Sequence, residues 1–260
     1  FFAPISGLLI NSFTVIPVIR VLYLVFSVNM LIKVAVTFRY CKETRQGKIR
    51  MAETKNTSLL HMLFEYKELI PKVLKDKEVM KVLAVSVILY ITNMVSTNFF
   101  SLYVTQWLGI ESRYLAFFPI LNAAVMLIFM IGIQHKLELV KFRIPMWVGL
   151  ALYAIAVILL ILAPVGNMLF VIIYVFIVAV AGALVMPRKD TLIQLSINAE
   201  ERARINALIM SFTIAFSSPF GYFAGWLSSI DRRLPFAFAF VLFLAAFIIV
   251  GRIRDPEFSK

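Results

Sequence analysis

Hydrogen-bonding side chains recur along one face of the apolar stretch 80–106. At 100° per residue they fall within an arc of about 140°. The residues that share this face are Ser86, Tyr90, Asn93, Thr97, Asn98, Ser101 and Thr105. Polar groups in such a helix bind a neighbouring helix or border a wet pathway for a solute. Both alternatives stay open, and we expect the opposite arc, with Ile88, Ile91 and Val95, to face lipid.

A second apolar stretch, 204–227, has a similar polar face and a possible bend. The polar residues predicted to contact a solute on this stretch and on 114–134 are Thr213, Ser217 and Asn122, with Asn206 beside them. Pro219 removes a backbone hydrogen bond and bends a helix. Gly221 and Gly225 have the four-residue spacing that allows two helices to approach closely. Simple tight packing explains this pair equally well.

Groups for acid–base or metal chemistry are absent from the apolar stretches after residue 80. None of those six stretches contains Asp, Glu or His. His61 and His135 are far apart in the sequence, and Cys41 is the single cysteine. A metalloenzyme needs clustered ligands, and a hydrolase needs a partnered base. We therefore expect no enzyme activity, no metal site and no cofactor.

The elements that must position the polar faces are membrane-spanning helices, and we predict an all-α membrane bundle. The chain is 62% hydrophobic and only 15% charged, with a mean hydropathy of +0.92. Apolar runs of about 18 residues or more are long enough to cross a bilayer core of about 30 Å. The expected spans are 16–38, 80–106, 114–134, 144–163, 168–187, 204–227 and 234–251. Residues 1–12 are apolar but shorter, and we interpret them as the end of a further helix.

Basic residues indicate how these spans are oriented. Twenty-one of the 26 Lys and Arg residues fall in alternate connections, eleven of them in 39–81. The positive-inside rule places those connections and the C-terminus in the cytoplasm. Residues 1–38 then form the end of an N-terminal half, 39–79 a cytoplasmic linker with an amphipathic helix, and 80–260 a six-helix domain. Those six spans form two sets of three with opposite insertion, which is typical of an inverted repeat.

The connection and helix at 186–227 resemble the helix 10 to helix 11 region of the major facilitator superfamily. The residues that carry the resemblance are Glu200, Glu201, Arg202, Arg204, Ser217, Ser218, Pro219, Gly221 and Gly225. The resemblance implies that 1–12 is the end of helix five, 16–38 is helix six, and 80–251 is helices seven to twelve. The loop from Gly132 to Glu138 departs from the family pattern because it lacks an Asp and a second Gly.

The resemblance implies that helices seven, eight, ten and eleven line a solute cavity. The predicted pathway residues are Tyr90, Asn93, Thr97, Asn98, Ser101, Asn122, Thr213 and Ser217. The residues predicted to act in helix packing and gating are Pro219, Gly221, Gly225, Arg202, Arg204 and Asp190. Because the pathway residues are uncharged, they favour a neutral polar or amphipathic solute.

The predicted function is secondary active transport of a small solute by alternating access, with efflux as plausible as uptake. The expected partners are that solute, the lipid bilayer and the N-terminal half of the same transporter, with no nucleic acid. We expect an integral protein of the bacterial inner membrane. Two alternatives stay open: a non-transporting protein whose basic loop binds a partner or anionic lipid, and an inactive truncated transporter.

Overall fold

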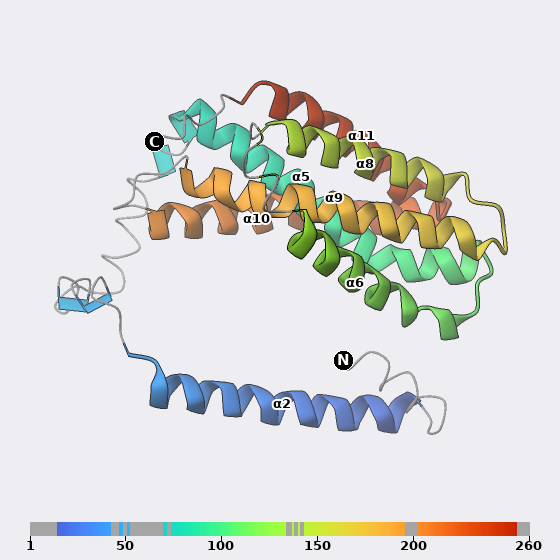
Figure 1. The fold of residues 1–260 in the computed structure, drawn as a ribbon, viewed down its shortest axis with the longest axis horizontal. Helices are drawn as coiled ribbons and strands as arrows, with labels where there is room; N and C mark the ends of the chain where they lie inside the picture. Colours follow the sequence, from blue (N-terminus) through green and yellow to red (C-terminus); the bar gives the residue numbers. More distant parts are fainter. Residues whose placement is uncertain are drawn as a thin grey trace. The chain divides into compact units, whose positions relative to one another are not determined.

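The structure is a computed structural model, and most of the residues that it describes are helical. The described residues are 15–42, 47, 48, 51, 52, 70, 71, 74–133, 137, 140, 143–195 and 202–253. The chain divides into two compact units, Phe1–Glu68 and Leu69–Lys260, which are drawn in Figure 1. Their boundary falls in the predicted linker. The predicted partial helix 1–12 and most of the predicted amphipathic helix lie outside the described residues.

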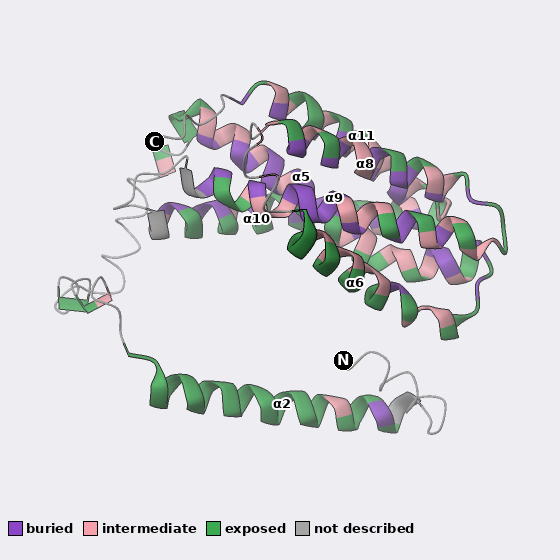
Figure 2. Ribbon diagram, viewed as in Figure 1, coloured by how far each residue is buried: buried purple, intermediate pink, exposed green. Residues whose placement is uncertain are grey.

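The first unit contains α2, Val15–Tyr40, which matches the predicted span 16–38. Nearly all of its described side chains are exposed, as the green ribbon in Figure 2 shows. They are mostly apolar, and Tyr23 and Leu31 are among the most exposed. A helix that is apolar on every side is stable only when lipid or other helices cover it.

The second unit contains six helices long and apolar enough to cross a membrane. They are α5 (Lys77–Leu102), α6 (Phe117–Gly132), α8 (Arg143–Ile161), α9 (Met168–Leu195), α10 (Arg202–Ile230) and α11 (Leu234–Gly251). With α2 this gives the seven predicted spans among the described residues. The predicted end of one span is wrong: α9 continues through Pro187 to Leu195, where the sequence indicated a loop from 188.

Local signals explain both ends of α5. Asp76 caps its start, because its carboxylate accepts hydrogen bonds from the backbone N–H groups of Glu78 at 2.9 Å and Val79 at 3.2 Å. At the other end the helix widens into a π-turn, η1 (Tyr103–Trp107). Gly109 then turns the chain with a positive φ of 68°, a conformation that glycine adopts without a Cβ clash.

Helices that are neighbours in space are mostly not consecutive along the chain. The main contacts pair α6 with α9, α9 with α8, α8 with α11, α11 with α5, and α5 with α10. The two spans with few polar residues, α8 and α11, pack against each other, with α8 also on α9 and α11 also on α5. Gly149 allows α8 to approach α9: a Cβ there would lie 2.5 Å from Cγ2 of Val185 and 3.2 Å from the carbonyl oxygen of Ala181.

Hydrogen bonds join the helix ends on both sides of this unit. At the end that carries most of its Lys and Arg residues, here named the basic end, Lys81 Nζ donates to the carbonyl oxygen of Arg252 at 2.6 Å. Arg143 donates to the carbonyl oxygen of Ile253 at the same end. At the opposite end the N–H of Gly166 donates to the carbonyl oxygen of Leu108 at 2.7 Å. The helices therefore alternate in direction, as the predicted topology requires.

Candidate functional site

Most of the polar face of α5 is exposed, and its apolar face is buried in the bundle. Asn93 and Thr97 are exposed, whereas Ile88, Ile91 and Val95 are buried. The expectation that the apolar arc faces lipid was therefore wrong. Apolar side chains are stabilised about equally by lipid and by a packed bundle, so the sequence pattern alone does not distinguish the two. In this unit α5 packs that arc against its neighbours and leaves the polar stripe uncovered.

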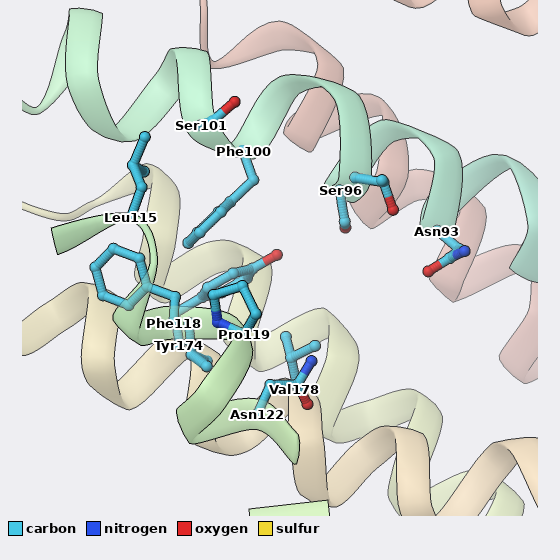
Figure 3. Close-up of a pocket in the computed structure, with 12 residues that line it drawn as sticks. Asn93, Ser96, Phe100, Ser101, Leu115, Phe118, Pro119, Asn122, Tyr174 and Val178 are labelled. Carbon is cyan, nitrogen blue, oxygen red and sulfur yellow. The ribbon is translucent and has the colours of Figure 1, made fainter. Parts of the chain in front are cut away.

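A first cavity of about 360 Å³ opens beside the polar stripe and is bordered by α5, α6 and α9. Its polar lining consists of Asn93, Ser96, Thr97, Ser101 and Asn122. Figure 3 shows Asn93 and Ser96 on α5, with Asn122 across the cavity on α6. The structure thus brings together four of the predicted pathway residues from two helices.

Aromatic rings form the other wall of the first cavity. Phe100 stacks on Tyr174 of α9 with ring centroids 5.5 Å apart. The same Phe100 meets Phe118 of α6 edge-on at 5.6 Å. Figure 3 shows these three rings grouped at one side of the cavity. Amides and hydroxyls therefore face a flat apolar surface, an arrangement that fits an amphipathic ligand.

A second cavity of about 370 Å³ is bordered by α5, α9 and α10. Its polar lining consists of Ser86, Tyr90, Asn93, Lys189, Asp190, Asn206 and Thr213. Lys189 lies near the end of α9, and Asn206 lies near the start of α10. The second cavity therefore extends from the middle of α5 towards the basic end.

Asn93 borders both of these cavities and a smaller one behind them. The smaller cavity, of about 50 Å³, is also lined by Ser96, Tyr153 and Phe243. The Tyr153 and Phe243 rings are stacked, with centroids 4.8 Å apart and planes within 2°. This packed aromatic pair closes the bundle behind the stripe, so the open space lies on the exposed side of α5.

The two predicted pathway residues on α10 differ in their surroundings. Thr213 is buried and borders the second cavity, and its hydroxyl donates to the carbonyl oxygen of Ile209 at 2.7 Å. Ser217 is completely buried, and its hydroxyl donates to the carbonyl oxygen of Thr213 at 2.6 Å. Ser217 lines none of the three cavities described above. Its role as a pathway residue stays a prediction.

Asn98 is exposed on α5 but is absent from the lining of these three cavities. It lies five residues beyond Asn93, which is about 140° around a helix with 3.6 residues per turn. Asn98 therefore offers a natural comparison for Asn93: the same amide, on the same helix, pointing in another direction.

The glycines of α10 have more space than the sequence motif indicates. A Cβ at Gly221 would lie 3.5 Å from the sulfur of Met94, which is ordinary contact, and a Cβ at Gly225 would meet nothing within 4 Å. Pro219 lies inside α10 and is exposed. The roles of these residues in packing and gating stay predictions.

The polar and charged residues expected near the basic end are only partly described. Arg204 is half-buried, and Asp190 borders the second cavity. Glu200, Glu201, the side chain of Arg202 and most of the loop from Gly132 to Glu138 lie outside the described residues. The gating role predicted for Arg202 therefore stays a prediction.

Sequence reasoning named Asp190 but missed Lys189 in the second cavity, because it ended α9 before these two residues. A signal was available: Val185, Arg188 and Leu192 have helical spacing, and all three are buried. It also missed Ser96 and the aromatic wall of the first cavity. The rings of that wall come from three helices, and their meeting depends on tertiary packing rather than on any local pattern.

Comparison with known proteins gives one match. The family model described as the Major Facilitator Superfamily matches residues 1–221. Neither the search of curated proteins nor the search of solved structures gives a match.

Proposed function

The chain belongs to the major facilitator superfamily, and on that premise we propose that it moves a small solute across the membrane by alternating access. The observation that carries the proposal is the position of Asn93, which borders the cavity towards the basic end and the cavity away from it. A solute bound at Asn93 could leave through one cavity or the other, one at a time, as alternating access requires.

The depth of Asn93 supports this proposal. It is 16 residues from Lys77 and 14 from Trp107, the two ends of the span. At 1.5 Å per residue these separations are about 24 Å and about 21 Å along the axis. Asn93 therefore lies near the middle of the span. An amide at this depth is costly when it faces lipid and useful when it faces a wet pathway.

The exposed stripe is the face that we propose to be covered by the N-terminal half of the same transporter. Covering it would enclose both cavities and remove the polar side chains from lipid. The basic end is then cytoplasmic by the positive-inside rule, and the C-terminus lies on that side of a bacterial inner membrane. Transport could run in either direction, efflux included, because Asn93 borders a cavity on each side.

We assign the conformational change to α10. Pro219 interrupts the backbone hydrogen bonding inside this helix, and Gly221 lies against α5 without a tight contact. A helix that bends at Pro219 and slides over Met94 could narrow the second cavity, while Phe220 and Phe223 keep it in contact with Phe238 of α11. This assignment agrees with the rocking of one helix group against another in such transporters.

Thiol labelling tests alternating access without knowledge of the solute. Cys41 is the only cysteine of the 260-residue sequence and is exposed. Cys41→Ser, with replacement of any cysteine outside this sequence, gives a background for Ser101→Cys, Asn206→Cys and Asn93→Cys in the full protein. A membrane-impermeant maleimide is added to one side of oriented vesicles at a time. We expect Ser101→Cys to react from the outer side, Asn206→Cys from the basic side, and Asn93→Cys from both sides.

The Asn98→Cys variant is the matched control, since it changes the same residue type on the same helix outside the three cavities. Unlike Asn93→Cys, the Asn98→Cys variant should not react with the maleimide from both sides of the membrane. If Asn93→Cys reacts from neither side, or from one side only under every condition, the central position of Asn93 is refuted. A protein that merely docks a partner through its basic linker would give that one-sided result.

A further inference from the structure

Resting on the proposed function, we infer that the second cavity binds the anionic group of an organic solute through Lys189 and Ser86. This differs from the uncharged solute that the sequence favoured, because the continuation of α9 to Leu195 brings a charged side chain into the cavity wall. The inference depends on one cationic side chain, one unsatisfied hydroxyl and the apolar lining between them.

Lys189 supplies the positive charge. Its side chain is 24% exposed, and its Nζ lies 3.0 Å from Oδ1 of Asp190, whose side chain is 63% exposed. Both residues line the second cavity. Neighbouring residues on a helix point about 100° apart, so the lysine must lean along the helix to reach this carboxylate. Asp190 thus occupies the place of an anion beside the ammonium group of a mostly covered lysine side chain.

Ser86 supplies a hydrogen-bond donor that the protein does not use. It is 7% exposed, and its hydroxyl has no hydrogen-bond partner among the described residues. Other hydroxyls in these helices donate to a carbonyl of the preceding turn, as Thr92, Thr213 and Ser217 do. A buried polar group without a partner is costly. Because Ser86 lines the second cavity, we take this unused donor as the second contact for the ligand.

The remaining lining defines the rest of the ligand. Tyr90 and Asn206 add a phenol and an amide. The lining also contains apolar side chains from three helices: Leu89, Ile193, Ile209, Met210 and Ile214. A cavity of about 370 Å³ with this lining accommodates a carboxylate on a compact apolar body. The ligand class is therefore a small amphipathic organic anion.

Binding exchanges one anion for another at Lys189. The solute carboxylate accepts from the ammonium group and from the Ser86 hydroxyl, and Asp190 is released to solvent, where it is already largely exposed. No charge is left buried without a partner. The exchange also predicts that the two neighbouring residues have opposite effects, since Lys189 attracts the ligand and Asp190 competes with it.

The test compares carboxylates with amides of the same shape. Benzoate and benzamide, and phenylacetate and phenylacetamide, are titrated into the purified full protein, with thermal stability as the readout. We expect at least one carboxylate to bind about tenfold or more tightly than its amide. Inorganic phosphate is titrated in the same way. Stabilisation by phosphate and by none of the carboxylates would indicate an inorganic ligand and overturn the assignment of an organic anion.

Four variants separate a binding role from a structural one. Lys189→Gln should abolish the preference for the carboxylate, and Asp190→Asn should increase it. Ser86→Ala should weaken carboxylate binding without lowering the unfolding temperature of the ligand-free protein, since it removes an unsatisfied group. Lys75→Gln removes a charge at an exposed position outside the three cavities and should change none of these values.

The inference is overturned if neither carboxylate is preferred over its amide, or if the preference persists in Lys189→Gln. If Ser86→Ala binds carboxylates as tightly as the natural protein does, the Ser86 hydroxyl does not contact the ligand, and that part of the inference is overturned. These outcomes are independent of thiol labelling. If Asn93→Cys is labelled from both sides but no carboxylate is preferred, the transport proposal stands and the anion-binding inference fails. If a carboxylate is preferred but labelling is one-sided, the protein binds an anion without transporting it.

Discussion

The hydroxyl of Tyr103 donates a hydrogen bond to the carbonyl oxygen of Leu160 at 2.9 Å, in the buried interior between α5 and α8. Tyr103 is the first residue of the π-turn η1, and Leu160 lies near the end of α8. The bond therefore fixes the end of the helix that carries the polar stripe to the layer behind it.

Removal of this bond should lower stability without altering the cavities. Tyr103→Phe keeps the ring and its packing against Phe236, whose centroid is 5.0 Å away, and loses only the hydroxyl. We expect a loss of about 0.5–1.5 kcal/mol in the free energy of unfolding, measured by denaturation in detergent. Tyr222→Phe is the control, because Tyr222 is 85% exposed. An equal loss in both variants would contradict the assigned role of this bond.

The glycines of α8 and α10 should respond in opposite ways to the same substitution. Gly149→Ala would place a Cβ within 3.2 Å of the Ala181 carbonyl oxygen and closer still to Val185. Such overpacking typically costs about 1–3 kcal/mol, and we expect a lower unfolding temperature. Gly225→Ala meets open space and should be neutral or slightly stabilising, since alanine favours helix. A destabilising Gly225→Ala would instead support the close approach that its sequence motif suggests.

The end of α11 should open more readily when Lys81 is removed. Lys81 bridges the Glu78 carboxylate at 2.7 Å and the Arg252 carbonyl oxygen at 2.6 Å. Lys81→Met keeps an aliphatic side chain and loses both contacts. Hydrogen exchange of the amides from Ile249 to Ile253 should then become faster. Lys77→Met, at the exposed start of α5, is the matched control, and equal exchange in the two variants would show that the bridge does not hold this end.

The connection between α10 and α11 should show a small dependence on acid. Arg233 donates from its side chain and its backbone N–H to the carboxylate of Asp231, and these bonds hold the Asp231 pKa below its ordinary value. Because the folded pKa is the lower one, the stabilisation is complete above about pH 3.9 and is lost as the pH falls through the folded pKa.

In Asp231→Asn that dependence should disappear. The unfolding temperatures of the variant and the natural protein, compared at intervals from pH 6 to pH 2, should converge as the pH falls. The difference near pH 6 should be on the order of a degree, since this ion pair is at the surface. A difference that grows on acidification would contradict the sign of the pKa shift.

The sequence predicted the spans well because each is a long apolar run between charged connections. It predicted the polar face of α5 for the same reason, since helical periodicity is local. The sequence does not show whether lipid or other helices cover the apolar face of α5, because side chains such as Val95 and Ile91 are stable in either environment. The burial of these two residues follows from the packing of α5 against α10 and α11.

The error at the end of α9 has a different cause. Pro187 and the charges after it are typical of a helix boundary, yet the helix continues, and Thr191 Oγ1 donates to the Pro187 carbonyl oxygen at 2.9 Å. Arg188 is accommodated because it donates to the carbonyl oxygen of Leu137, on the connection after α6, at 2.8 Å. A contact between residues 51 positions apart cannot be inferred from local sequence.

If solute binds at Asn93 as proposed, the shared position of this residue has a kinetic consequence. Two solute molecules that each need its amide cannot be bound together, one from each side of the membrane. Occupancy would therefore be limited to one molecule per turnover, and solute accumulating on the far side would slow net flux by competing for the same amide. Trans-inhibition and a fixed stoichiometry of one would both follow from the placement of a single side chain.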